Sequence, residues 1–452
     1  MPKLKALALL LAASLLTGCA AAGPERGSQE FLQQAVIYEV NLRQFGDGGF
    51  KEVTNHLPRL SELGVDILWL MPIHPISELN RKGELGSPYS VANYLEVNPE
   101  YGTEKDLREL IKQAHSKNML VILDWVANHT GWDNPWITEN PDWYTKDLDG
   151  NITFPPGTDW TDVADLNFDN QEMQEAMISA MEYWVKEFDV DGFRADVAHS
   201  VPVEFWNKAS ERLHQIKDVF MLAEDGGDME LLEIAFDTNY AWSLQGLFNG
   251  FGTPYLNASD FRWAMQSQAE QYVNGKYQMV FIDNHDENSW QATVFTRFGD
   301  NVKNLALLSF TIPGMPLIYS GNEVGLDRQL LFFEKDPIVF PAKEDWGKSD
   351  WEIFYKQLVE LKTQNPALWT SGAGGELTVL HEEDTFFLAF ARSYQGNDVV
   401  VLINLMPEEQ SQVLELGDYA GEYQDFFSKQ TTTLEPGMTL PANSFLVLTR
   451  NQ

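Results

Sequence analysis

Residues 188–196, FDVDGFRAD, are an apolar run that ends in two opposite charges, Arg194 and Asp196. On a strand, residues i and i+2 point to the same face, so these two side chains can pair. The pairing is expected to lower the pKa of Asp196 and to keep its carboxylate ionised at neutral pH. The pair is therefore either a structural salt bridge or an activated carboxylate nucleophile.

Other apolar runs also end in polar side chains. Besides Arg194 and Asp196, these are Asp124, Asn128 and His129 in DWVANH, Glu224 in MLAE, and Asp283, His285 and Asp286 in FIDNHDEN. Two carboxylates that flank a sugar bond are the minimum for glycoside hydrolysis, because one must be ionised and the other protonated. The apolar run before Glu224 and neighbouring negative charge are expected to raise the pKa of Glu224, which suits a general acid. Asp286 is then expected to stabilise the charge that develops on the sugar, with His129 and His285 as neutral donors to its hydroxyl groups.

The apolar runs that end in these polar side chains alternate regularly along the chain with helical patterns. The expected strands are 35–42, 65–71, 119–126, 188–196, 219–224, 232–238, 278–284 and 316–320. Alternating strands and helices favour parallel βαβ units, and eight such units favour a closed (β/α)8 TIM barrel. Side chains that do chemistry in such a barrel lie at the carboxyl ends of the strands. An open doubly wound sheet is the alternative, although no glycine-rich phosphate loop follows the first strand.

Two segments outside the barrel are expected to form units of their own. The connection 130–169 is long and rich in Trp, Asn and Pro, which predicts a short inserted loop domain after the third strand. Its tryptophans are either sugar platforms or loop core. Alternating runs near the C-terminus predict an antiparallel β-sandwich domain. The expected boundaries are 1–18 for a signal peptide, 19–30 for a tether, 31–129 and 170–370 for the barrel, 130–169 for the inserted domain, and 371–452 for the C-terminal β domain.

The N-terminus has the features of an export signal. Two lysines precede the apolar run 6–16, which is too short to span a membrane. LTGC at 16–19 resembles a bacterial lipoprotein signal, and Cys19, the single cysteine of the chain, is the expected lipidation site. We therefore expect an exported protein that is lipid-anchored to the cell envelope. Ala20 and Ala21, the first two residues after the cysteine, are compatible with sorting to the outer membrane.

The overall charge narrows the range of partners. The net charge is −36, from 31 Lys and Arg against 67 Asp and Glu. Such a surface repels nucleic acid and anionic lipid headgroups, so we expect no nucleic-acid partner. A metal hydrolase is disfavoured because the 8 histidines are scattered, without a His-x-His pair.

Four blocks of the sequence, in order, resemble the motifs of the α-amylase family, glycoside hydrolase family 13. The blocks are DWVANH, GFRADVAH, MLAE and FIDNHD, and ADLN at 164–167 resembles a fifth motif. The segments IYEVNLRQF, SPYSVANYLEVNPEYGT and IPGMPLIYSGNEVG are also similar to that family, so the resemblance covers roughly residues 35–450. It implies an α-glucan hydrolase that cleaves α-glucosidic bonds in starch-type poly- or oligosaccharides, with no cofactor required for the chemistry.

The resemblance implies a role for each of the three carboxylates. Asp196 resembles the nucleophile, Glu224 the acid/base and Asp286 the stabiliser of the transition state. The implied reaction is a double displacement that retains the anomeric configuration through a glucosyl enzyme. The two reacting carboxyl groups of such an enzyme lie roughly 5–5.5 Å apart.

The resemblance also implies residues that support or line the sugar site. Arg194 resembles the arginine that orients the nucleophile. His129, His285 and Tyr89 resemble residues around the sugar ring, with Tyr89 stacked on it. Asp124 resembles a family position that supports the site structurally.

Several alternatives stay open at this point. Asn128 and Asp165 resemble positions that hold a structural calcium in many α-amylases, but a hydrogen-bonding role fits them equally well. The same motifs serve family members that transfer glucosyl groups or isomerise disaccharides. A glucan-binding surface protein without activity is a further alternative, which the presence of all three carboxylates disfavours. Oligomeric state and chain-length preference are not encoded in these motifs.

Overall fold

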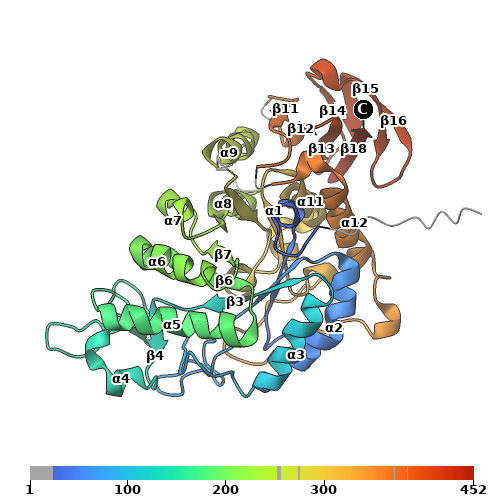
Figure 1. The fold of residues 1–452 in the computed structure, drawn as a ribbon. Coiled ribbons are helices and arrows are strands. Elements are labelled where there is room, and N and C mark those ends of the chain that lie inside the picture. Colours follow the sequence, from blue (N-terminus) through green and yellow to red (C-terminus); the bar gives the residue numbers. More distant parts are fainter. Residues whose placement is uncertain (1–23, 252–255, 273–274, 371, 384, 452) are drawn as a thin grey trace, which may run out of the picture.

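A computed structural model of the protein describes residues 24–251, 256–272, 275–370, 372–383 and 385–451. Eight parallel strands close into a barrel in the order β1-β10-β9-β8-β7-β6-β3-β2 (Figure 1). The strands are β1 (Ile37–Val40), β2 (Ile67–Leu70), β3 (Leu120–Trp125), β6 (Gly192–Ala195), β7 (Phe220–Ala223), β8 (Thr238–Tyr240), β9 (Tyr277–Val280) and β10 (Met315–Tyr319). The predicted (β/α)8 barrel is therefore confirmed.

Helices surround the barrel, and their ends follow local sequence signals. They are α1 (Gln29–Gln34), α2 (Phe50–Leu63), α3 (Glu104–His115), α5 (Gln171–Phe188), α6 (Val203–His214), α7 (Met229–Glu233), α8 (Trp242–Gly250), α9 (Ala258–Gln271), α10 (Val294–Phe298), α11 (Val302–Thr311) and α12 (Asp350–Gln364). Thr103 and Asp106 form a reciprocal capping box at the start of α3. Gly64 ends α2 in the left-handed conformation, at φ 92°.

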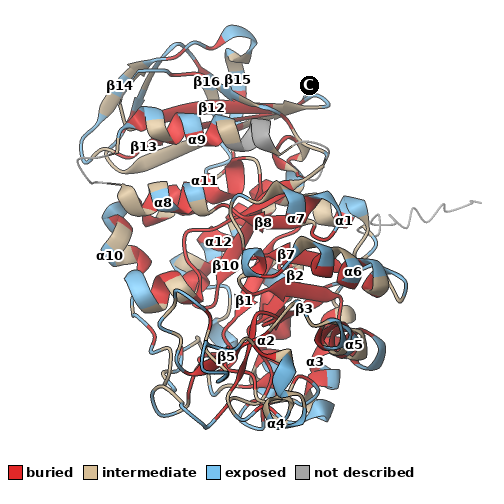
Figure 2. Cartoon of the chain, turned by 90° about the vertical axis from the view of Figure 1, so that its left-hand side faces the viewer, coloured by how far each residue is buried: buried red, intermediate tan, exposed pale blue. Residues whose placement is uncertain are grey.

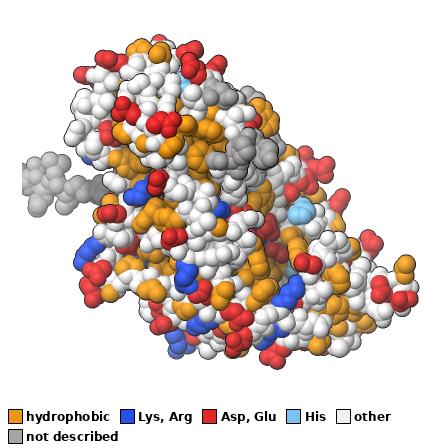
Figure 3. Space-filling model, turned by 180° about the vertical axis from the view of Figure 1, so that it is seen from behind, with side chains coloured by type: hydrophobic (Ala, Val, Ile, Leu, Met, Phe, Trp, Pro, Cys, Tyr) orange, Lys and Arg blue, Asp and Glu red, His pale blue; other side chains and the backbone are white. Residues whose placement is uncertain are grey.

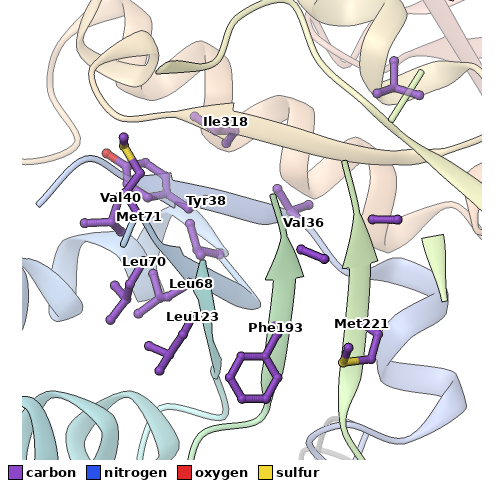
Figure 4. Close-up of a cluster of buried hydrophobic side chains, with 14 of the residues drawn as sticks. Val36, Tyr38, Val40, Leu68, Leu70, Met71, Leu123, Phe193, Met221 and Ile318 are labelled. Atoms are coloured by element: carbon purple, nitrogen blue, oxygen red, sulfur yellow. The ribbon is translucent and has the colours of Figure 1, made fainter. Parts of the chain in front are cut away.

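The strands alternate between the barrel interior and the helix layer. Outward-facing side chains, among them Tyr38, Val40 and Phe193, pack in the main apolar cluster with the helices (Figure 4). Ile37 and Ile122 belong instead to the apolar cluster that fills the barrel. Because side chains alternate with period two, the interior positions above these two are Glu39 and Asp124. Polar side chains therefore form the uppermost inner layer of the barrel, over an apolar filling.

The predicted sixth strand was misplaced. The run 232–238 ends helix α7 and continues through a short connection in which Ile234 is exposed and Phe236 is buried, and the barrel strand β8 begins only at Thr238. The strand itself reads TNY and is buried along its whole length. It lacks the apolar run that marks the other strands, because Thr238 and Asn239 are fully buried polar side chains.

The segment after β3 leaves the barrel as a separate small unit. It contains the antiparallel pair β4 (His129–Gly131) and β5 (Val163–Asp165), with the short helix α4 (Trp136–Glu139) between them. His129 pairs with Asp165 in this ladder. The unit lies at the end of the molecule opposite the C-terminal domain (Figures 1 and 2).

The C-terminal domain consists of antiparallel strands, as predicted. They are β11 (Leu377–Val379), β12 (Phe387–Tyr394), β13 (Asn397–Asn404), β14 (Gln410–Val413), β15 (Gly421–Asp425), β16 (Thr431–Leu434), β17 (Gly437–Leu440) and β18 (Ser444–Asn451). Six of them form one sheet, and β14 pairs with β17. In β13, Val399 and Val401 face the main cluster, whereas Val400 and Leu402 face the domain's own core. Burial on both faces explains the unbroken apolar run of this strand (Figure 2).

The N-terminal part of the described chain packs against the apolar filling of the barrel. Ser28 caps α1, so residues 28–30 are part of a helix end rather than of a tether, and Phe31 packs in the apolar cluster of the barrel. The signal peptide and Cys19 lie outside the described residues. Within the described residues no helix is long and apolar enough to cross a membrane. Acidic side chains are spread over the face shown in Figure 3, with fewer basic ones among them.

The start of β6 requires a glycine, which gives a test of the fold. Gly192 has φ 145°, and a Cβ there would lie 1.9 Å from the Phe220 carbonyl oxygen on β7. We expect Gly192→Ala to lower the free energy of unfolding by at least about 1–3 kcal/mol, because β6 and β7 must separate. Gly246→Ala, in helix α8 with nothing within 4 Å of the added carbon, should be stabilising by about 0.5–1 kcal/mol. Denaturant unfolding of both variants checks this, and equal stabilities would contradict it.

Candidate active site

One cleft of about 640 Å³ at the carboxyl ends of the strands collects most of the predicted site residues. It is lined by Lys82, Ser87, Tyr89, His129, Asp159, Trp160, Asp162, Val163, Asp196, Val197, Glu224, His285, Asp286, Trp290, Phe332 and Phe333. The three carboxylates Asp196, Glu224 and Asp286 follow β6, β7 and β9, and all reach this cleft. The structure therefore places these three side chains in one cleft, as the strand-end argument predicts, while their catalytic roles stay a prediction.

Arg194 lies directly beneath the cleft and contacts two of these carboxylates. Its Nη1 donates to Asp196 Oδ1 and to Asp124 Oδ1, each at 2.9 Å. Its Nη2 lies 2.9 Å from Glu224 Oε2. The guanidinium is fully buried, and its Nε donates to the Tyr240 hydroxyl at 3.0 Å. One buried cation is thus shared by three carboxylates from three neighbouring strands.

Burial and nearby charges act in opposite directions on the pKa values of Asp196 and Glu224. Burial raises the pKa of Asp196 to about 6, although Arg194 opposes the increase. The expected net decrease was wrong, because the sequence does not show that the carboxyl group is withdrawn from water. Burial also raises the pKa of Glu224, with Arg194 opposing and Asp196 and Asp286 adding to the increase. The predicted direction for Glu224 is confirmed, and both groups titrate above ordinary carboxyl values.

Asp124 has the supporting position that was expected of it. Besides Arg194, it accepts hydrogen bonds from the Trp69 indole at 3.1 Å and from the Tyr89 hydroxyl at 3.0 Å, both to Oδ2. Its side chain is fully buried and does not line the cleft. Asp124 therefore holds Arg194 and Tyr89 in place from below.

The two histidines differ in their charge. Burial lowers the pKa of His129 to about 4, so this ring is neutral, as predicted. For His285, burial favours the neutral ring, but Asp286 and Glu39 outweigh it and raise the pKa to about 9. Glu39 Oε1 lies 2.6 Å from His285 Nδ1. The expectation of a neutral His285 was therefore wrong, because it took no account of the glutamate on β1.

Trp290 is a part of the site that sequence reasoning missed. It lies in a π-helical turn, Glu287–Gln291, directly after Asp286. Its indole Nε1 donates to Asp286 Oδ1 at 3.1 Å, while 53% of the side chain is exposed. Such turns are frequent at functional sites. The position, four residues after the aspartate, was the signal available in the sequence.

Aromatic side chains form part of the lining of the cleft. Phe332 stacks near Tyr89, at 6.2 Å between ring centroids, and lies 5.0 Å from the Trp290 ring. Trp160 lies 5.6 Å from the His129 ring. Trp136 and Trp143 instead pack on each other at 5.1 Å, within the inserted unit. Of the tryptophans in 130–169, Trp160 is the one that lines the cleft.

Asn128 directly precedes β4, and Asp165 belongs to β5. The Asn128 amide lies 3.3 Å from His129 Nδ1, and burial raises the pKa of Asp165. Among the described residues no group of three or more His, Cys, Asp or Glu side chains is arranged to hold a metal. Calcium also takes amide and backbone oxygens as ligands, so binding at Asn128 and Asp165 stays a prediction.

Comparison with known proteins gives the family. The family sequence model of the alpha-amylase catalytic domain matches residues 33–150 and 157–399. The chain belongs to the alpha-amylase family. Among curated relatives, Alpha-amylase 2 of Dictyoglomus thermophilum is 27% identical over 92% of this chain and 73% of the relative.

Solved structures of alpha-amylases match this chain in fold and over most of its length. An alpha-amylase from Lactobacillus plantarum is 32% identical with a TM-score of 0.81, and a maltogenic alpha-amylase from Thermotoga neapolitana is 27% identical with a TM-score of 0.83. Each match covers 93% of this chain and 99% of the other chain. The match therefore includes the barrel and the C-terminal β domain of this alpha-amylase family member.

Arg194 is expected to govern the stability of this site as well as its geometry. In Arg194→Leu, three buried carboxyl groups lose their shared cation, so we expect a loss of about 3–5 kcal/mol in the free energy of unfolding near neutral pH. The carboxyl groups then have pKa values raised further above those of the unfolded chain. Their protonation at low pH removes the unpaired charge, so the deficit must shrink as the pH falls through those pKa values.

Denaturant unfolding of wild type and variant at about pH 5 and about pH 8 measures this deficit. Arg194→Lys keeps a positive charge and serves as the matched control, with a smaller deficit at the higher pH. A deficit of Arg194→Leu that is equal at both pH values would contradict the electrostatic explanation.

Proposed function

We propose that this protein is a retaining α-glucan hydrolase that cleaves α-glucosidic bonds in starch-type poly- or oligosaccharides. The observation that carries the proposal is the shared contact of Arg194 with Asp196 and Glu224, in a cleft that also contains Asp286. Two carboxyl groups bound to one guanidinium are near neighbours. This supports the short separation of about 5–5.5 Å that a covalent double displacement needs.

Asp196 is the proposed nucleophile. Arg194 holds its Oδ1, which leaves Oδ2 to attack the anomeric carbon. The attack forms a bond from Oδ2 to that carbon and breaks its bond to the leaving oxygen, which gives a glucosyl ester of Asp196. The hydrogen bonds from Arg194 fix the orientation of the carboxylate and stabilise its ionised form.

Glu224 is the proposed acid and base. Its Oε2 accepts a hydrogen bond from the Val197 backbone N–H at 2.8 Å and also faces Arg194. The proton of the acid form is therefore assigned to Oε1. That proton passes to the leaving oxygen in the first step, and the carboxylate then takes a proton from the water that hydrolyses the ester.

Asp286 and the surrounding rings complete the proposed sugar site. Asp286 is held by Trp290 and lies beside the cationic His285, at 3.5 Å from Nε2. Its carboxylate faces the cleft and would stabilise positive charge on the sugar ring. The ring of Tyr89 lines the same cleft, where a sugar face can pack on it.

A product time course on maltoheptaose tests this function directly. We expect short maltooligosaccharides, with the α-anomer appearing first in proton NMR spectra because two inversions give net retention. Asp196→Ala should lower the rate at least about 10⁴-fold, since the nucleophile is absent. A β-linked glucan oligomer of similar length is the control substrate and should remain intact.

The other outcomes of this time course favour the alternatives. Products longer than maltoheptaose would show a transglycosylase on the same site, and a rearranged linkage in a disaccharide product would show an isomerase. Binding of maltoheptaose without any turnover would favour a glucan-binding surface protein.

We also propose that the protein is exported and lipid-anchored to the bacterial cell envelope through Cys19. The proposal is supported by the lysines, the apolar run 6–16 and LTGC at 16–19. An envelope anchor would place the enzyme where extracellular glucans arrive. Lipidation at this cysteine would bring several acyl chains, and stable membrane attachment requires more than one.

Metabolic labelling with a radioactive fatty acid in a bacterial host tests the anchor. We expect label on the wild-type protein and none on Cys19→Ala, because the chain has a single cysteine. Asp196→Ala is the matched control and should be labelled like wild type. Equal labelling of the Cys19→Ala variant would rule out this anchor site.

A further inference from the structure

Glu39, a buried glutamate on β1, takes no direct part in the proposed bond cleavage. Glu39 is fully buried, and it occupies the inner layer of the barrel above Ile37. Within the described part of the chain its Oε2 has no hydrogen-bond partner. A buried carboxylate oxygen without a donor is costly, so packing alone would favour an apolar residue at this position.

Among the described residues, the side chain of Glu39 makes its one hydrogen bond with His285. Glu39 Oε1 lies 2.6 Å from Nδ1. Burial raises the pKa of Glu39, while His285 and Arg194 favour its ionised form. An ionised carboxylate can only accept, so Nδ1 carries a proton. The other ring nitrogen, Nε2, lies 2.8 Å from the Tyr89 hydroxyl. His285 and Tyr89 are also stacked, with ring centroids 5.3 Å apart and 20° between the planes.

The proton on Nε2 follows from the partners of Tyr89. The Tyr89 hydroxyl has one hydrogen, and Asp124 Oδ2 lies 3.0 Å from it. Asp124 accepts from Arg194 and from the Trp69 indole as well, as an ionised carboxylate does. Tyr89 therefore donates to Asp124 and accepts from His285 Nε2. Acceptors on both sides of the imidazole require a proton on each ring nitrogen.

We propose that Glu39 is a positioning residue that keeps His285 doubly protonated, so that a cationic Nε2–H faces Tyr89 and the sugar site. The structure contains a continuous chain of contacts from Glu39 through His285, Tyr89 and Asp124 to Arg194. Glu39 thereby acts on the floor of the cleft without touching it. The kinetic consequence rests on the proposed hydrolase function, whereas the protonation state does not.

Taken together, the charged groups around His285 stabilise its cationic form. Asp286 on its own loop and Glu39 on β1 attract the cation, and Asp124 on β3 adds to them, while Arg194 on β6 repels it. Glu39 in turn faces Arg194 and Asp286, and the Tyr240 and Tyr319 hydroxyls lie near it. Glu39 is the one carboxylate in direct contact with Nδ1 among the described residues. Removal of its charge should therefore lower the pKa of the ring, because both an ion pair and a hydrogen bond to the charged form are lost.

The variant Glu39→Gln tests the proposal, because it keeps the size of the side chain and removes the charge. Long-range ¹H–¹⁵N spectra of the full-length protein distinguish a doubly protonated ring from a neutral one, and the His285→Asn spectrum identifies the signal. We expect His285 to be cationic in wild type at about pH 7.5 and neutral in Glu39→Gln. On maltoheptaose, kcat should fall about tenfold with little change in KM, since a charged donor is replaced by a neutral one.

Two further variants separate positioning from a structural effect. Glu323 is also fully buried but pairs with Arg59, so Glu323→Gln should lower stability and leave the His285 signal cationic. Glu39→Asp keeps the charge and should restore part of the cationic signal. A neutral His285 in wild type, or a ring that stays cationic in Glu39→Gln, would overturn the proposal. A shifted ring signal in a protein that cleaves no glucan would overturn the hydrolase function and leave the role of Glu39 standing.

Discussion

The site depends on one buried guanidinium. Arg194 is fully enclosed in the upper layer of the barrel, and Asp124, Asp196 and Glu224 all contact it. A cation buried at that depth is stable only when carboxylates surround it, and the buried carboxylates are stable in their ionised form only beside the cation. The three strands that carry these side chains, β3, β6 and β7, must therefore stay in register, and the close contact of Gly192 with β7 maintains that register.

Burial and charge act against each other throughout this layer, and the balance differs from residue to residue. Burial dominates at Asp196 and Glu224 despite Arg194, whereas carboxylates dominate at His285 despite burial. The result is a cleft with two carboxyl groups whose pKa values are raised and one histidine that stays charged. A sugar that displaces water from the cleft strengthens all of these interactions, because the surroundings become less polarisable.

The sequence predicts the regularly repeated strands and helices, and the points where a sequence signal ends them. Period-two alternation and charged strand ends located Asp196, Glu224 and Asp286, and capping signals located the end of α2 and the start of α3. Strand β8 was missed because it is short and buried with polar side chains. Glu39 was passed over because a single acid inside an apolar strand does not show its partner, which lies 246 residues away. Phe332 and Trp290 were missed because their place in the cleft depends on how loops fold back.

The division between strands and loops has a functional consequence. Asp124, Arg194 and Glu39 stand on strands and are buried, so their positions are fixed by the same packing that closes the barrel. The aromatic lining comes from connections: Trp160 from the inserted unit, Trp290 from a π-helical turn, and Phe332 from the segment after β10. Side chains on connections can change without disturbing the barrel core, since their backbones lie outside the ladder of strand hydrogen bonds. We infer that the strands fix the chemistry of bond cleavage, and that the loops decide which glucan fits beside it.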